Sequence, residues 1–475
     1  MSKEQQQRAQ QKKMTQDIIK DILYLLKNNN IISDYKLTGG NGITSILVEE
    51  VSDIITKTVS DVNITNKNGK NVKNKIIKDL TATAKNHIKK LLPIDIKTYA
   101  LITAADMKKY AIISNSGQLG ERIRQFLWDA QRTKQYAFAD YCVFLHTPGK
   151  LSDDKYNKEH KKAKNQFNKY INTPNSINSL DYFLSEEEFF WKFANIFIAS
   201  KKEDDNDNSG QIDDARGKVY ELLLAIIFKF EINWKRWNGK TQSGGFMYNM
   251  FCQLMNKFTE NRDDSKIDDI IVDFGNDITE LLPSSNPDTS NRKRKPKTDV
   301  RIKIKYKSET EYTSYTISAK CSSAESVSAH EYRVYDFIEA LDLGESDKDL
   351  IKALNDFQDK GNFSDMKKEN KALFKAGIIA HKEALYKWVI TGECVNEKRY
   401  PYITDRALQI ANYLVCYNPK TKETLIHTSQ DYINYLLTKK IKKNNHSGTP
   451  LTFTHPSGGK GNYIQIKIPL NWHKK

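Results

Sequence analysis

The chain has 475 residues, enough for about three domains at roughly 150 residues each. Its 24 tyrosines and 20 phenylalanines supply more core material than a disordered chain carries, which excludes that class. Lysine and arginine total 75 against 59 aspartates and glutamates. The resulting net charge of +16 favours a polyanionic partner such as nucleic acid, although a solvated basic surface gives the same balance.

The N-terminal region, residues 1–185, is predicted to be mostly helical. Apolar residues recur at helical spacing within 18–26, 43–59 and 76–92. Residues 1–14 are polar and lack the apolar run of a secretory signal, so we expect a cytoplasmic protein. No apolar stretch reaches the roughly 20 residues of a membrane helix, so we expect no membrane partner.

The central region, residues 186–390, opens with a helix predicted at 216–229. This helix is apolar on most sides and should therefore lie against a sheet. Glu221 stands among its leucines and isoleucines, where a carboxylate must be paired, hydrated or metal-bound because burying it bare is costly. A buried strand at 267–274 and a β-hairpin spanning 300–320 are predicted to follow.

The C-terminal part, residues 391–475, is expected to be rich in β-strands. Its pattern predicts strands at 408–417 and 423–427, a helix at 429–439 and a last hairpin of 451–454 with 463–468. The succession of helices and strands along the chain predicts an α/β fold, with a mixed sheet flanked by helices.

Three polar side chains of the central hairpin, Asp299, Ser318 and Lys320, are predicted to converge. Side chains alternate along a strand, so each of the three lies on the polar face of its strand. A turn closing at 308–309 places Asp299 opposite Ser318, and one closing at 309–310 places it opposite Lys320. A carboxylate that holds a divalent cation beside an ammonium suits phosphodiester hydrolysis, because both charges stabilise the negative charge that develops on phosphate.

Residues 297–300 (KTDV) and 317–320 (ISAK), preceded by a helix with Glu221, resemble the signature of the PD-(D/E)XK nucleases. Among these they look similar to type II restriction endonucleases of the HpaII and MspI type. The resemblance implies a restriction-endonuclease-like fold with a nuclease core at 186–390. The N-terminal region would then be a DNA-recognition domain or arm, and the C-terminal part would complete the core or the DNA cleft.

The same resemblance assigns roles to the site residues. Asp299 would be the chief Mg²⁺ ligand, assisted by the Ala319 carbonyl group and Glu221. Lys320 would be the cation that activates water. Ser318 stands where the signature has an acid and would act as a weak or indirect ligand.

The implied function is sequence-specific, Mg²⁺-dependent hydrolysis of double-stranded DNA, by a monomer or homodimer that works beside a cognate methyltransferase. Basic and polar residues near the hairpins are predicted to contact DNA: Arg292, Lys293, Arg294, Lys295, Lys297, Ser322, Ser323, His330 and Lys460. A solvated loop remains the alternative for the basic run, and a plain turn for the hairpin tip that carries Lys460. Two alternative functions stay open. One is a structure-specific repair or resolvase-type nuclease, and the other is a noncatalytic nucleic-acid-binding protein with a decayed site.

Overall fold

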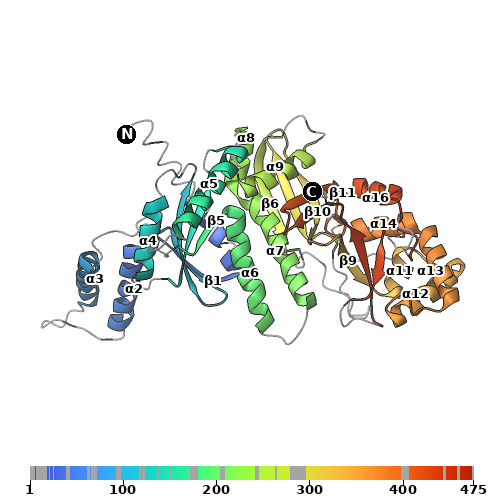
Figure 1. Ribbon diagram of the computed structural model, residues 1–475, viewed down its shortest axis with the longest axis horizontal. Coiled ribbons are helices and arrows are strands. Elements are labelled where there is room, and N and C mark those ends of the chain that lie inside the picture. The colour runs from blue at the N-terminus through green and yellow to red at the C-terminus, as the bar shows by residue number, and fades with distance from the viewer. Residues whose placement is uncertain are drawn as a thin grey trace. The chain divides into compact units, whose positions relative to one another are not determined.

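Residue contacts divide the chain of this computed structural model into two compact units (Figure 1). Unit 1 comprises Met1–Glu203 and Gly239–Asn249, and unit 2 comprises Asp204–Asn238 and Met250–Lys475. Apart from a few isolated residues, the structure describes 19–38 with gaps at 21 and 25, 43–60, 72–91, 98–116, 123–135, 139–148, 151–171, 180–203, 209–240, 245–260, 265–275, 296–396, 406–441, 446–456 and 461–472. The three-part division of the sequence, with boundaries after residues 185 and 390, stays a prediction.

Unit 1 contains a five-stranded sheet in the order β1-β2-β3-β4-β5. Its strands are β1 (Ile32–Leu37), β2 (Ala100–Ala104), β3 (Lys109–Ser116), β4 (Tyr141–Thr147) and β5 (Tyr182–Ser185). The first three strands pair antiparallel, whereas β3, β4 and β5 run parallel. The expectation of a mostly helical N-terminal region omitted this sheet, because β4 is one continuous buried run without the alternation that marks a half-exposed strand.

Three helices pack on the sheet of unit 1: α4 (Ile123–Gln135), α5 (Asp153–Ile171) and α6 (Glu186–Glu203). The first two connect the parallel strands, and α6 follows β5. Leu127 of α4 and Phe167 of α5 join one buried cluster with Phe144 of β4. On α6, Phe193 packs edge-on against Tyr110 of β3.

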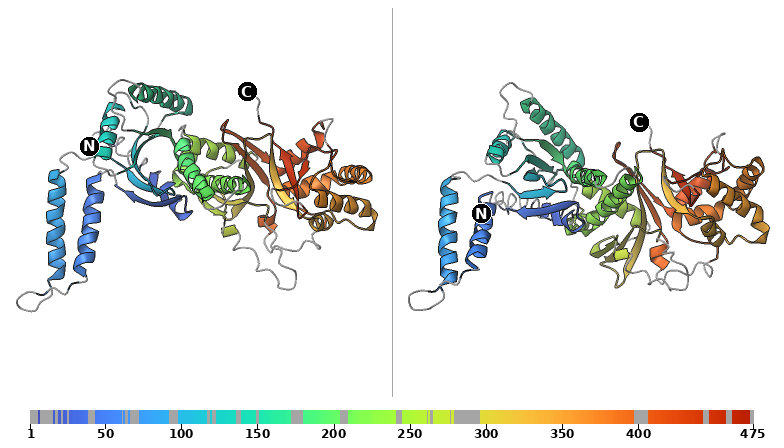
Figure 2. Two further views of the ribbon diagram at one scale, coloured as in Figure 1. Left: turned by 60° about the horizontal axis from the view of Figure 1, so that its bottom comes forward. Right: turned by 90° about the horizontal axis from the view of Figure 1, so that it is seen from below.

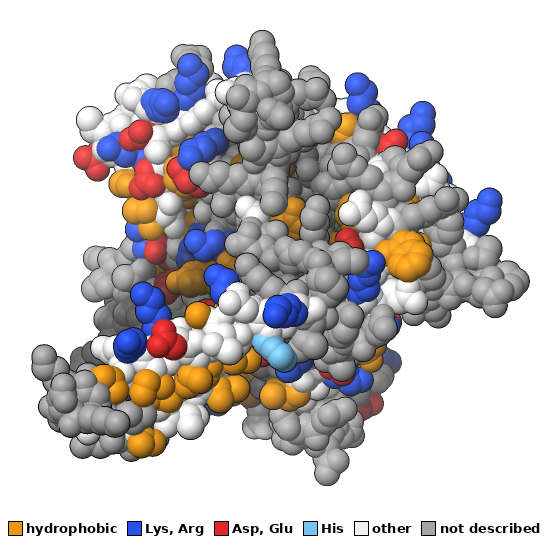
Figure 3. Space-filling model, turned by 90° about the vertical axis from the view of Figure 1, so that its left-hand side faces the viewer, with side chains coloured by type: hydrophobic (Ala, Val, Ile, Leu, Met, Phe, Trp, Pro, Cys, Tyr) orange, Lys and Arg blue, Asp and Glu red, His pale blue; other side chains and the backbone are white. Residues whose placement is uncertain are grey.

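Two further helices, α2 (Ile43–Ser60) and α3 (Lys73–Leu91), lie side by side as a hairpin (Figure 2). Hydrophobic side chains form a row across the lower part of the face drawn in Figure 3. Ile54 of α2 and Leu80 of α3 are both exposed. The two helices were predicted from their periodicity, and the structure confirms them.

Unit 2 is built on a five-stranded mixed sheet in the order β11-β10-β8-β7-β6. Its strands are β6 (Ile267–Phe274), β7 (Val300–Tyr306), β8 (Tyr312–Cys321), β10 (Tyr413–Asn418) and β11 (Glu423–Thr428). Only β8 and β10 pair parallel, and all other neighbours pair antiparallel. Helix α7 (Ser209–Lys229) packs on β6, β7 and β8, as its apolar surface predicts. Helices α8 (Glu231–Asn238) and α9 (Phe246–Phe258) follow it in the chain.

A second sheet of unit 2 has the order β12-β13-β9 and is antiparallel. Its strands are β9 (Ser326–Tyr332), β12 (Thr452–Thr454) and β13 (Ile464–Pro469). The helices of this part are α11 (Val334–Ala340), the short η2 (Glu345–Asp347), α12 (Lys348–Lys360), α13 (Lys368–Ala380), α14 (Lys382–Thr391), α15 (Arg406–Gln409) and α16 (Ser429–Thr438). Most of these helices share one hydrophobic core with the second sheet. The helix predicted at 429–439 and the last hairpin are confirmed, as is the strand predicted at 423–427. The strand predicted at 408–417 begins only at Tyr413, because Arg406–Gln409 form the short helix α15. Among the described residues, no helix is both long and apolar enough to cross a membrane.

Candidate active site

The pairing of β7 with β8 sets the geometry of the candidate site. Val300 aligns with Ile317 across the antiparallel ladder, which places Asp299 opposite Ser318. This is the register expected of a turn closing at 308–309. Side chains directly opposite each other in an antiparallel pair lie on the same face.

Asp299 is the centre of a cluster of hydrogen bonds. Its Oδ2 atom accepts hydrogen bonds from the backbone N–H of Ala319 at 2.8 Å, the hydroxyl of Ser318 at 3.3 Å and Nζ of Lys320 at 3.4 Å. No hydrogen bond to its Oδ1 atom comes from the part of the chain that the structure describes. The side chains of Lys320 and Asp299 are 18% and 23% exposed. The cluster therefore holds the carboxylate through one oxygen and leaves the other for a ligand that solvent can deliver.

Electrostatic interactions keep Lys320 charged although it is largely removed from solvent. Burial alone would lower the pKa of Lys320, but the carboxylates of Asp299 and Glu221 outweigh it and raise that pKa above its usual value. Glu221 lies half-buried on α7, the helix that packs on β8. The structure thus brings together four of the predicted residues, Asp299, Ser318, Ala319 and Lys320, and places Glu221 within electrostatic reach of them.

Lys297 adds a second amine near the cluster. Its Nζ donates a hydrogen bond to the backbone carbonyl of Ala329 on β9 at 3.0 Å. The pKa of Lys297 is lowered to about 7, mainly because the amine is buried and to a smaller extent because Lys320 is positively charged. The carboxylate of Asp299 acts in the opposite direction and raises that pKa. Its predicted contact with a DNA phosphate stays a prediction. The hydrogen bond shows that the amine is turned toward β9.

The oxygen ligands of the site suit a hard divalent cation. In the described parts of the chain, no three His, Cys, Asp or Glu side chains are grouped closely enough to hold a metal by themselves. The site offers the open Oδ1 atom of Asp299 and the carboxylate of Glu221. Mg²⁺ is commonly bound through one or two carboxylates and keeps several of its waters, so this small set of oxygens fits Mg²⁺ better than a metal that needs a full protein cage.

Three of the other residues predicted to contact DNA lie in or after the strands β8 and β9. Ser322 directly follows β8, and its backbone N–H donates to the carbonyl of Tyr417. Ser323 is exposed in the same turn, and His330 lies half-buried on β9. Their contacts with DNA stay predictions. Residues 292–295, which hold four of the predicted cations, and Lys460 lie outside the described residues.

The sequence did not reveal an ion pair on the polar face of β7. Arg301 aligns with Asp273 of β6, and its Nε lies 2.8 Å from Oδ2 of that carboxylate. Lys303 lies 3.5 Å from the same oxygen. Asp273 therefore attracts both cations, and Lys320 is the cation that pairs with Asp299. Strand alternation placed Arg301 on this face, but only the register with β6 shows its partner.

Comparison with known proteins places this site in a family. The model of the family described as restriction endonuclease MspI matches residues 229–468, just over half of the chain. The chain belongs to the MspI restriction endonuclease family. The matched residues include Asp299, Ser318 and Lys320, whereas Glu221 precedes them.

Individual members of the restriction endonuclease group are similar to parts of the chain. The type II restriction enzyme BsuFI of Bacillus subtilis is 28% identical over 190 residues, which are 40% of this chain and 44% of that enzyme. The chain thus spans less than half the length of this relative. The crystal structure of restriction endonuclease MspI in complex with its cognate DNA matches 54% of this chain and 91% of that chain, at 18% identity and a TM-score of 0.41.

Proposed function

We propose that the chain is a type II restriction endonuclease that cleaves both strands of duplex DNA at a specific sequence, with the PD-(D/E)XK type of site. The observation that carries the proposal is the cluster on β7 and β8. There one carboxylate accepts hydrogen bonds from Ala319, Ser318 and Lys320, while its Oδ1 atom receives none from any residue that the structure describes. Membership of the restriction endonuclease family supports the same function.

The residues of the cluster divide the work of hydrolysis. Lys320 remains an ammonium, so it can orient the attacking water and neutralise charge that develops on the scissile phosphate. Water attacks phosphorus and releases a proton to solvent, the bond to the 3′ oxygen breaks, and that oxygen takes up a proton from solvent, which leaves a 5′-phosphate and a 3′-hydroxyl end. Ser318 and the Ala319 N–H fix the carboxylate of Asp299 in one orientation during this step.

A divalent cation completes the proposed site. Asp299 and Glu221 would hold Mg²⁺, with the carbonyl of Ala319 as a further oxygen ligand. When bound there, Mg²⁺ polarises a phosphate oxygen and makes its bound water more acidic. Because Ser318 replaces the acid usual in the signature, we propose that most remaining ligand positions are filled by water.

Digestion of plasmid DNA tests the function. The proposal expects discrete fragments in the presence of Mg²⁺, no cleavage in EDTA, and ends that a ligase can rejoin without added phosphate. Fragment ends that map to one short sequence identify a restriction enzyme. Cutting confined to branched or damaged DNA would instead assign the cluster to a structure-specific nuclease.

The proposal also implies a functional partner in the cell. A sequence-specific nuclease in the cytoplasm endangers its own genome, so we propose a cognate DNA methyltransferase that modifies the same sequence. Plasmid DNA modified by that methyltransferase should resist cleavage. Binding of DNA without cleavage under all these conditions would identify a noncatalytic binding protein and refute the proposed activity.

A further inference from the structure

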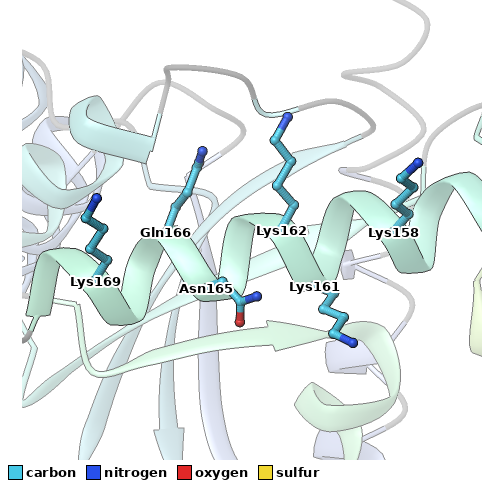
Figure 4. Close-up of a pocket in the computed structure, with 6 residues that line it drawn as sticks. All are labelled: Lys158, Lys161, Lys162, Asn165, Gln166 and Lys169. Carbon is cyan, nitrogen blue, oxygen red and sulfur yellow. The ribbon is translucent and has the colours of Figure 1, made fainter.

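The outer face of α5 in unit 1 carries a concentration of lysines that the family match does not reach, since that match begins at residue 229. Six polar side chains line a shallow hollow along this helix (Figure 4): Lys158, Lys161, Lys162, Asn165, Gln166 and Lys169. We call them the α5 lysine face. In Figure 4, Lys158, Lys162, Gln166 and Lys169 rise from one side of the helix, and Lys161 and Asn165 extend from the adjoining side.

The opposite face of α5 is fixed to its unit. Tyr156, Ala163 and Phe167 are buried. Lys164 forms an ion pair of 2.6 Å with Glu188 of α6. Because this apolar stripe is already buried, the described side chains of α5 leave no hydrophobic face to insert into a lipid bilayer, as an amphipathic membrane-binding helix requires.

The charges of the α5 lysine face are poorly compensated. Lys162 lies 3.9 Å from Glu159, and its side chain is 63% exposed. For Lys158, Lys161 and Lys169, all exposed, the structure gives no ion pair with any residue that it describes. Four ammonium groups thus follow one helix over about 16 Å at a rise of about 1.5 Å per residue.

We infer that the α5 lysine face binds the phosphate backbone of duplex DNA; the inference rests on the proposed function for the identity of its partner. Lys158 and Lys162 lie one helical turn apart, about 6 Å along the axis, and Lys169 follows two turns later, about 10.5 Å further on. A row of cations along one helix can neutralise several phosphates of a DNA strand at once. Asn165 and Gln166 add amide N–H donors, which commonly bind phosphate oxygens. Such contacts carry no sequence information, so the face contributes affinity and register while other elements select the sequence.

The salt dependence of DNA binding tests this inference. A variant of the full chain changes Lys158, Lys161, Lys162 and Lys169 to glutamine, and its affinity for a duplex oligonucleotide is measured in EDTA over a range of salt concentrations. A plot of log K against log salt has a negative slope, and each lost phosphate contact makes it shallower by about 0.9. Loss of four contacts should therefore reduce the magnitude of the slope by about 3 to 4. Between 50 and 200 mM salt the unmodified chain should then lose about 150-fold more affinity than the variant loses.

Matched variants separate a local contact from a change in net charge. In the control variant, four other exposed lysines are replaced by glutamine. Each of them lies within 4 Å of a carboxylate: Lys235, Lys348, Lys352 and Lys387. Its net charge equals that of the α5 variant, and we expect its slope to change by less than about 1. Arginine at the four α5 positions should preserve the slope. If the fourfold glutamine variant does not fold, Lys161→Gln and Lys169→Gln alone should each lower the slope by about 0.9.

An α5 variant with the slope of the unmodified chain, or of the control, would overturn the inference. If the α5 variant keeps its DNA slope but no longer binds vesicles of phosphatidylcholine and phosphatidylserine, the face is a membrane contact and the inference is likewise overturned. The proposed nuclease function fails independently. A reduced slope in a chain that never cleaves DNA supports the α5 contact and refutes the enzyme, whereas cleavage with an unchanged slope refutes the contact alone.

Discussion

Replacing Ser318 by aspartate introduces an acid where the proposed nuclease signature usually has one. Ser318 is 1% exposed, and its hydroxyl lies 3.3 Å from Oδ2 of Asp299. Two carboxylates about 4 Å apart repel each other by about 4 kcal/mol at an effective dielectric constant near 20. Lys320 offsets part of this repulsion, so in EDTA at neutral pH we expect the free energy of unfolding to fall by about 2 to 3 kcal/mol.

A bound divalent cation should reverse that effect, because it attracts both carboxylates. Mg²⁺ should therefore raise the melting temperature of the Ser318→Asp variant more than that of the unmodified chain. The Ser318→Asn variant has a similar size without the charge and should show neither effect. Scanning calorimetry in EDTA and at increasing Mg²⁺ measures both quantities. Equal Mg²⁺-induced shifts in the aspartate variant and the unmodified chain, or an unchanged stability in EDTA, would refute this reasoning.

Two further predictions concern stability. Burial alone would raise the pKa of Glu188, but His160 and Lys164 outweigh it and hold that pKa below 4.5. The ionised Glu188 therefore contributes to the free energy of unfolding above pH 4.5, and this contribution is lost as pH falls toward the pKa of the folded state. In urea titrations, Glu188→Gln should lower the free energy of unfolding by about 1 to 3 kcal/mol at pH 7 and by less at pH 3. An equal cost at both pH values would contradict this. In unit 2, Gly392 has φ +86° and a Cβ there would lie 2.7 Å from a backbone oxygen, so alanine should cost about 1 to 3 kcal/mol. The control is alanine at Gly217, where an added Cβ meets nothing within 4 Å, and this change should not lower the stability of the chain. Similar urea midpoints for the two alanine variants would show that Gly392 is not strained.

Local periodicity was sufficient to predict the elements that carry the site. Strand β6 covers 267–274, as predicted, because apolar residues and flanking polar loops define it. It was expected to be buried, but it lies at the edge of its sheet and is only partly buried. Strand alternation limited the register of β7 and β8 to two candidates, and the structure has the one that places Asp299 opposite Ser318. The bounds of these strands and the faces of their side chains depend on residues close in sequence, so they can be predicted from the sequence alone.

Pairings between distant segments were not predictable in the same way. Strand β10 lies parallel to β8 although about 90 residues separate them, and no local pattern specifies that neighbour. The hydrogen bond from Lys297 to a carbonyl of β9 is likewise a contact of tertiary structure that no local pattern specifies. The sheet of unit 1 was missed for another reason, since its strand β4 lacks the alternation by which single strands are recognised.

The most direct test of the central claim is single-turnover cleavage of a duplex that contains the mapped site, with binding measured in parallel in Ca²⁺. The account predicts that Asp299→Asn and Lys320→Ala still bind this duplex but cleave it at least about 100-fold more slowly in Mg²⁺ than the unmodified chain. Cleavage by either variant at the rate of the unmodified chain would contradict the assignment of the reaction to this cluster.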